Sequence, residues 1–161
     1  MVEKTSNNAA AGSADPMSQA IAEAKEAARN GEVPVGAVVF HRPTQKILSI
    51  ASNLVETNID ATAHAELLAI REASKLLASP RLIDCDLYVT LEPCTMCASA
   101  ISHARIARVY FGAYDPKGGG VEHGARFYQQ PTCHHQPEVI GGMREEECAS
   151  LLKSFFSERR D

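Results

Sequence analysis

Two short segments of the chain contain the residue types best suited to chemistry. Residues 62–66 read TAHAE, and residues 92–97 read EPCTMC. Cysteine thiolates and histidine imidazoles are preferred ligands of zinc. Cys94 and Cys97 are three residues apart, so on a helix they share one face and can bind the same ion. The pattern therefore predicts a zinc ion held by Cys94, Cys97 and His64.

The number of ligands favours a catalytic zinc site over a structural one. A structural zinc ion usually has four protein ligands, whereas a catalytic ion keeps one position for water. The sequence offers no convincing fourth ligand. Glu66 does not share a helix face with His64, so we expect it to act beside the metal as the general base that takes a proton from the water. A structural zinc site, or no metal site, is the alternative.

The hydrophobic pattern predicts which elements position these residues. We expect four helices, over residues 15–30, 62–78, 94–103 and 143–160. We expect strands over residues 33–40, 46–52, 86–91 and 108–112, with a further short strand before the last helix. The short link at 41–45 favours an antiparallel first pair. This order implies a mixed sheet with helices on both faces, and both helices that carry site residues begin after a strand.

Length and composition limit the class of protein. The 161 residues suit one domain, here 15–161, while residues 1–14 are rich in Ala, Asn, Ser and Gly and are expected to be a disordered extension. We find no secretory signal and no apolar run long enough for a membrane span, so we expect a cytoplasmic protein. Five cysteines in that setting indicate thiols or metal ligands. The net charge of −4 gives no indication of nucleic-acid binding, which is usually accompanied by a surplus of basic residues.

Several further segments carry a resemblance to a known family. They are EVPVGAV at 32–38, TAHAE at 62–66, LYVTLEPCTMC at 87–97, ARIARVYFGA at 104–113, DPKG at 115–118 and the FF…RR ending at 155–160. The TAHAE and PCxxC segments are typical of the zinc-dependent cytidine and deoxycytidylate deaminase superfamily as a whole. With the other segments, the chain resembles the bacterial tRNA-specific adenosine deaminases. The resemblance implies a cytidine-deaminase-like, three-layer α-β-α fold with a mixed sheet of about five strands.

The resemblance also implies an activity. Members of this family convert adenosine to inosine at the wobble position of an arginine tRNA anticodon. The implied partner is the anticodon stem-loop, and the implied assembly is a homodimer with one Zn²⁺ per subunit. Glu66 would take a proton from the zinc-activated water and deliver it to N1 of the adenine ring while the oxygen attacks C6.

Five residues are expected to contact the substrate, by resemblance alone. Asn53 would form a hydrogen bond with the nucleoside, the Ala65 backbone N–H would contact the base, and Val35 would line the pocket. Asp115 would touch the RNA backbone, and Phe156 would flank the site. Three of them have a structural alternative. Asn53 suits the end of a strand or a turn, and Asp115 precedes a proline and suits a turn. Phe156 falls on the apolar face of the last helix and suits the core.

The long segment at 115–137 is open to several interpretations. Its histidines, with Arg126 and Tyr128, are suited to contact unpaired bases, but an ordinary surface loop is an equal alternative. A second metal site at Cys133, His134 and His135 is a further interpretation. It is disfavoured because no carboxylate or cysteine at a fixed helical spacing completes the ligand shell.

Two other functions share part of the pattern. A deaminase of free guanine or cytosine would have the same TAHAE and PCxxC segments, and the acidic net charge mildly favours it. A noncatalytic zinc module that binds RNA or a partner would need four ligands and would have no use for Glu66. The DPKG segment and the last helix favour the tRNA enzyme.

Overall fold

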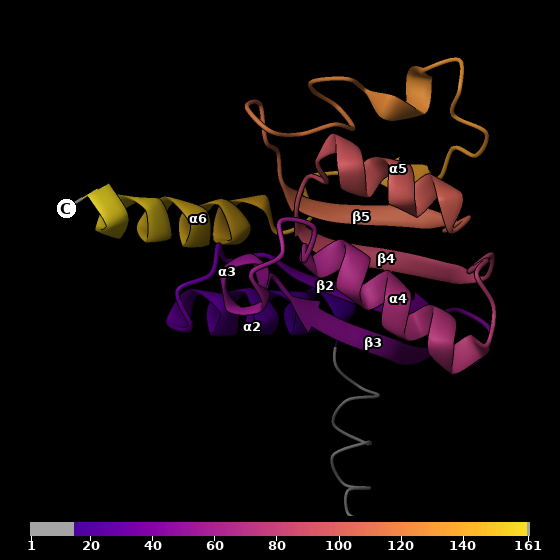
Figure 1. Ribbon diagram of the computed structural model, residues 1–161, viewed down its shortest axis with the longest axis horizontal. Helices are drawn as coiled ribbons and strands as arrows, with labels where there is room; N and C mark the ends of the chain where they lie inside the picture. The colour runs from indigo at the N-terminus through magenta and orange to yellow at the C-terminus, as the bar shows by residue number, and fades with distance from the viewer. Residues whose placement is uncertain (1–14, 161) are drawn as a thin grey trace, which may run out of the picture.

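The structure is a computed structural model that describes residues 15–160 (Figure 1). The proposed extension at 1–14 lies outside the described residues. The helices are α2 (Pro16–Arg29), α3 (Val55–Asn58), α4 (Ala65–Leu77), α5 (Thr95–His103) and α6 (Glu145–Arg160), with a 3-10 turn at Phe127–Gln129. The strands are β2 (Gly36–His41), β3 (Lys46–Ser52), β4 (Cys85–Leu91), β5 (Arg108–Ala113) and β6 (Glu138–Ile140).

The five strands form one mixed sheet in the order β3-β2-β4-β5-β6. Strand β2 is antiparallel to β3, which confirms the pairing predicted from the short link. Strand β2 is also antiparallel to β4. Strand β5 is parallel to β4 and to β6. The parallel connection from β4 to β5 runs through α5, as a parallel pair requires a crossover. The predicted short strand before the last helix is β6.

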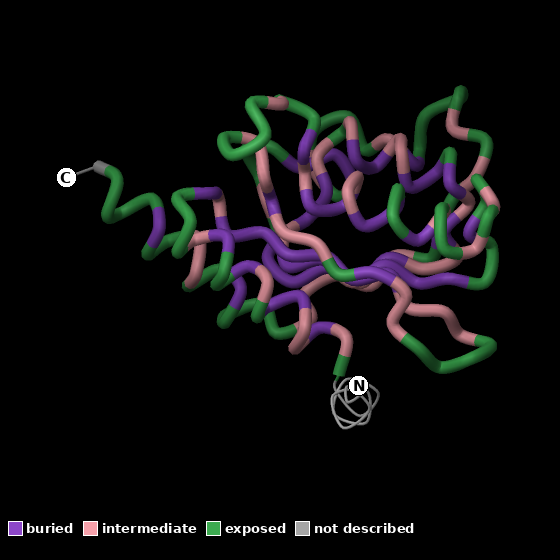
Figure 2. Tube along the Cα trace, turned by 60° about the horizontal axis from the view of Figure 1, so that its bottom comes forward, coloured by how far each residue is buried: buried purple, intermediate pink, exposed green. Residues whose placement is uncertain are grey.

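Helices cover both faces of the sheet and give the expected three layers (Figures 1 and 2). Helices α4 and α5 lie on one face, and α2 and α6 lie on the other. The larger apolar core fills the space beneath α4 and α5, where Leu87, Val89 and Phe111 are fully buried. A smaller core beneath α2 and α6 contains Met17 and Cys148. The predicted fold class is therefore confirmed.

Helix α4 lies in an outer layer, and only one face packs inward, through Ala65, Glu66, Ala69, Ile70 and Ala73. Leu76 is consequently 57% exposed. Strand β2 begins at Gly36, later than expected. A side chain at Gly36 would collide with α2, because an added Cβ would lie 2.0 Å from the Ala20 carbonyl oxygen.

The topology brings two helix N-termini to the same end of the sheet. Helix α4 begins just after His64, and α5 begins just after Cys94, at the carboxyl end of β4. The two helices lie side by side on one face. Among residues 15–160, no helix is long and apolar enough to cross a membrane.

Candidate active site

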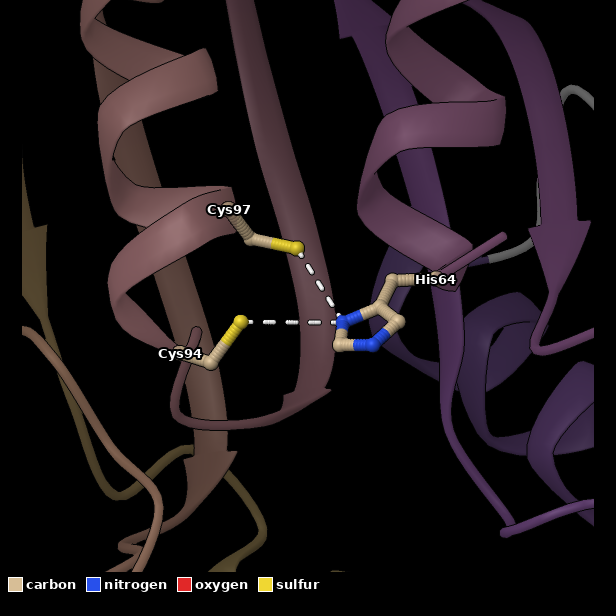
Figure 3. A group of neighbouring side chains, drawn as sticks. All are labelled: His64, Cys94 and Cys97. Carbon is tan, nitrogen blue, oxygen red and sulfur yellow. Dashed lines mark hydrogen bonds between the residues drawn. The ribbon is translucent and has the colours of Figure 1, made fainter. Parts of the chain in front are cut away.

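The three predicted zinc ligands come together between the first turns of α4 and α5 (Figure 3). His64 Nδ1 lies 3.6 Å from Cys94 Sγ and 3.4 Å from Cys97 Sγ. His64 is the N-cap of α4 and Cys94 is the N-cap of α5, while Cys97 lies in the first turn of α5. His64 and Cys94 are partly exposed, and Cys97 is buried. The cluster is thus open to solvent on one side only.

The spacing of the ligand atoms fits a tetrahedral zinc ion. Zinc binds cysteine sulfur at about 2.3 Å and histidine nitrogen at about 2.0–2.1 Å, so tetrahedral ligands lie about 3.6 Å apart. The two sulfur–nitrogen distances agree with that value within about 0.2 Å. All three ligand atoms lie within 4.8 Å of one another. The donor set and its geometry therefore fit zinc with little rearrangement.

The two thiols are electrostatically prepared to bind a cation. A hydrogen bond from the Cys97 thiol, with help from His64, lowers the pKa of Cys94 to about 4. The same hydrogen bond, together with burial, raises the pKa of Cys97. The hydrogen bond thus favours the thiolate form of Cys94 and the protonated form of Cys97. Since zinc binds the thiolate form, the remaining proton is released when the metal binds.

Glu66 lies beside these ligands and is almost completely buried. Its side chain faces inward from the first turn of α4, and the residue is 4% exposed. Burial raises the pKa of the Glu66 carboxyl to about 7, and the neighbouring Cys94 adds to this effect. A carboxyl group that changes protonation near neutral pH is well matched to proton transfer.

Among residues 15–160, only His64, Cys94 and Cys97 form a cluster of three potential ligands. The cluster of Cys133, His134 and His135 is not one. Cys133 Sγ lies 3.2 Å from the His135 carbonyl oxygen, and the His135 ring forms a 2.7 Å hydrogen bond with the Ile106 carbonyl. These contacts fasten the loop to the end of α5, so the second metal site is not supported.

A pocket of about 540 Å³ opens onto the metal cluster. Asn53, Val35 and Asp115 line it. Asn53 is 7% exposed, and its backbone N–H is fixed by a 3.1 Å hydrogen bond to the Val35 carbonyl. Ala65 is fully buried and is not among the residues that line the pocket.

Asp115 and Phe156 stay predictions as substrate contacts, and their surroundings in the structure differ. Asp115 Oδ1 accepts hydrogen bonds from the backbone N–H groups of Lys117 and Gly118, so its carboxylate holds a turn. Phe156 is 45% exposed and does not line the pocket. Phe155, one residue earlier, is buried in the pocket wall with the Arg159 guanidinium 3.8 Å above its ring. The helical periodicity did not distinguish these adjacent phenylalanines.

Sequence reasoning missed two buried glutamates that shape the pocket. Glu32 accepts hydrogen bonds from the backbone of Glu56 and from the backbone and hydroxyl of Thr57, and so anchors α3. Glu92 accepts five hydrogen bonds, from His123 Nδ1 and from the backbone N–H groups of Asp115, Val121, Glu122 and His123. Burial alone would raise the pKa of Glu92, but these hydrogen bonds lower it. The only signal was its position immediately before Pro93.

Replacing Glu92 by glutamine should weaken the attachment of the 115–123 loop. The glutamine amide would place N–H donors against backbone N–H donors, so at least one hydrogen bond is lost. We expect the free energy of unfolding to fall by about 2 kcal/mol, with zinc content unchanged. Denaturant unfolding and metal analysis measure both quantities. Glu122→Gln, an exposed change in the same loop, is the matched control, and equal stability of the two variants would contradict this role for Glu92.

Comparison with known proteins agrees with this geometry. A sequence model of the cytidine and deoxycytidylate deaminase zinc-binding region matches residues 13–113. A tRNA-specific adenosine deaminase from Agrobacterium fabrum is 51% identical over 144 residues, which cover 89% of this chain and 93% of that protein. The chain belongs to the tRNA-specific adenosine deaminase family. It is therefore a zinc-dependent hydrolase.

Solved structures place this deaminase within the wider fold. A structure from a study of A-to-I editing by tRNA:A34 deaminases at the wobble position of transfer RNA matches with a TM-score of 0.83 and 51% identity. The match covers 85% of this chain and 98% of that one. A guanine deaminase from Nitrosomonas europaea matches with a TM-score of 0.77 at 19% identity, over 88% of this chain and 83% of that one. The second likeness concerns the fold alone.

Proposed function

We propose that this deaminase converts adenosine to inosine at the wobble position of an arginine tRNA anticodon. The observation that carries the proposal is the position of Glu66, a buried carboxyl that lines one pocket beside the three zinc ligands, two of which, His64 and Cys94, line the same pocket. That arrangement supports hydrolytic deamination. The tRNA substrate is supported by the 51% identity to the Agrobacterium fabrum tRNA-specific adenosine deaminase.

The chain's own residues account for the proton transfers. His64, Cys94 and Cys97 would hold the zinc, which when bound lowers the pKa of a water toward neutrality. Glu66 is placed to accept a proton from the attacking water and to donate it to N1 of the adenine ring. A bond forms between the water oxygen and C6, and the bond from C6 to the amino nitrogen breaks. Glu66 then takes the second water proton from the C6 hydroxyl and delivers it to the amino nitrogen, so that ammonia leaves and C6 becomes a carbonyl.

Different residues of the pocket wall are suited to the nucleoside and to the phosphate of the substrate. Val35 and Leu91 give the pocket apolar surface, and Asn53 offers a buried amide for a hydrogen bond to the nucleoside. Arg159 is the only lysine or arginine among the described residues that line the pocket. A guanidinium there, stacked on Phe155, is suited to a backbone phosphate. A free base would have no use for it.

A substrate comparison tests the proposal. The zinc-loaded enzyme is offered an arginine tRNA anticodon stem-loop with adenosine at the wobble position, the same RNA with guanosine there, and free guanine, cytosine and adenine. We expect inosine in the first RNA alone. Ammonia released from a free base, with the RNA unchanged, would overturn the proposal in favour of a nucleobase deaminase.

Arg159→Ala should weaken RNA binding without affecting the chemical step. If Arg159 neutralises one phosphate, its loss should raise KM for the stem-loop about fivefold at low salt and reduce the slope of log KM against log salt by about 0.7. Steady-state kinetics at several salt concentrations measure both. Lys153→Ala, an exposed change on the same helix outside this pocket, is the control. An unchanged salt slope in Arg159→Ala would show that this residue contacts no phosphate.

We further propose that the enzyme is a cytoplasmic homodimer with one zinc per subunit. The support is the family resemblance of the sequence together with the single cluster of ligands found among residues 15–160. Sedimentation of the zinc-loaded protein tests the dimer. A monomer at micromolar concentration would count against it.

A further inference from the structure

Tyr114 and His123 form an exposed aromatic pair next to the pocket. Their rings meet edge to face, with centroids 6.3 Å apart and planes at 79°. Tyr114 is 41% exposed, and the His123 side chain is partly exposed at 33%. The mechanism assigns neither ring a role. The pair therefore offers an aromatic surface without a known partner.

Neighbouring residues restrict the movement of the Tyr114 ring. Phe111 contacts it edge to face with a centroid distance of 5.0 Å. The backbone of Gly141 and Gly142 also approaches it: a Cβ added at Gly141 would lie 2.8 Å from the Tyr114 hydroxyl, and one at Gly142 would lie 3.6 Å from the ring. A ring fixed in this way loses little conformational entropy when a ligand stacks on it.

The His123 ring is held by Glu92. His123 Nδ1 lies 2.9 Å from Glu92 Oε1, and Glu92 accepts four backbone N–H groups as well. Since an ionised carboxylate only accepts, Nδ1 carries the proton and donates it. The hydrogen bond thereby fixes the orientation of the imidazole, and about a third of the His123 side chain is accessible to a ligand.

The pair adjoins the place where the target nucleotide must enter. Tyr114 directly precedes Asp115, and Glu92, which orients His123, lines the pocket together with Asp115. In an RNA substrate, the nucleotide next to the reacting one would therefore pass close to these rings. A free nucleobase in the pocket has no such neighbour.

We propose that the Tyr114–His123 pair is a stacking site for an unpaired nucleobase that flanks the reacting adenosine in an RNA loop. The inference rests on the proposed RNA substrate. Proteins that read single-stranded RNA commonly stack bases on aromatic side chains, and each such contact contributes substantially to affinity. The site positions the loop so that the neighbouring adenosine enters the pocket.

The first test separates binding from chemistry with the zinc-loaded enzyme and the anticodon stem-loop. Tyr114→Ala should raise KM at least about fivefold with the effect falling on KM rather than kcat. Tyr114→Phe retains the ring and should recover most of the affinity, and His123→Ala should show a smaller rise. Ile83→Ala removes exposed apolar surface elsewhere and is the matched control. A Tyr114→Ala enzyme with the wild-type KM would overturn the proposal.

The second test identifies the base. Stem-loops that lack the base on the 5′ or the 3′ side of the target adenosine are assayed with wild-type and Tyr114→Ala enzymes. We expect one abasic RNA to raise the wild-type KM and to abolish the difference between the two enzymes. If the Tyr114→Ala penalty is the same on both abasic RNAs as on the intact loop, no flanking base stacks there. Wild-type activity on the intact RNA reports separately on the proposed function.

Discussion

Glu66→Gln is expected to lower kcat for deamination about a thousandfold, while zinc content and RNA binding stay close to wild type. Glutamine has nearly the same shape, but it can neither take the proton from water nor deliver it to the adenine ring. The effect should therefore fall on kcat and leave KM nearly unchanged. Single-turnover measurement of inosine, together with metal analysis and RNA binding, checks all three quantities.

Glu72 provides the control for this substitution. It lies on the same helix, α4, but on the exposed face. Glu72→Gln should therefore retain full activity. If Glu66→Gln retained more than about a tenth of the wild-type kcat, another group would have to carry the proton. A parallel loss of zinc would instead show that Glu66 supports the metal site.

The same substitution should stabilise the metal-free protein at alkaline pH. Burial raises the pKa of Glu66 to about 7, above the ordinary value of 4.5. Between pH 4.5 and pH 7 the Glu66 carboxyl is ionised in the unfolded chain but protonated in the folded protein. The free energy of unfolding therefore falls as pH rises through this range, and the full loss is present above pH 7. The difference corresponds to about 3 kcal/mol. Denaturant unfolding of apo Glu66→Gln at pH 8 should show a gain over wild type that disappears below pH 4.5.

Such a gain would mean that the wild-type site is maintained at a cost in stability. Burying a carboxylate is unfavourable for folding unless its charge is fully compensated, yet proton transfer needs it there. Stability sacrificed at an active site is a common consequence of function. An apo Glu66→Gln protein no more stable than wild type at pH 8 would indicate that solvent reaches this carboxyl.

The metal ligands were predictable because their geometry is local. Cys94 and Cys97 share a turn of one helix, and His64 and Glu66 share the start of another, so spacing alone indicated the chemistry. The sheet order then had only to bring two helix N-termini together. The alternation of apolar strands and helices was sufficient to predict the mixed sheet with helices on both faces.

The rest of the site depends on contacts between segments distant in sequence. Glu92 was visible only as the residue before Pro93, because its five donors come from residues 115–123. Phe155 and Phe156 both suited the apolar stripe of α6, and only the rotation of that helix against the sheet assigns one to the pocket. Periodicity fixes which residues share a face, but not where the edge of that face meets solvent.

Cys97→Ser is expected to lose zinc, activity and part of the folding stability together. Serine is close in size to cysteine but does not supply the thiolate that zinc requires. Activity should fall below detection. If the wild-type zinc site is saturated about a hundredfold or more above its Kd, loss of the metal removes about 3–4 kcal/mol of apparent stability. Metal analysis and thermal unfolding, each with and without a chelator, measure these effects.

Cys148→Ser distinguishes the metal from the general cost of a buried hydroxyl. Cys148 is also buried, at 1% exposed, but it belongs to α6 and packs against the opposite face of the sheet. Its replacement should reduce stability modestly and leave zinc stoichiometry and chelator sensitivity intact. A chelator should lower the melting temperature of wild type and Cys148→Ser, and leave Cys97→Ser unchanged. If Cys97→Ser kept both its zinc and its response to the chelator, the third ligand would have to be another residue, and the catalytic site would need to be redrawn around it.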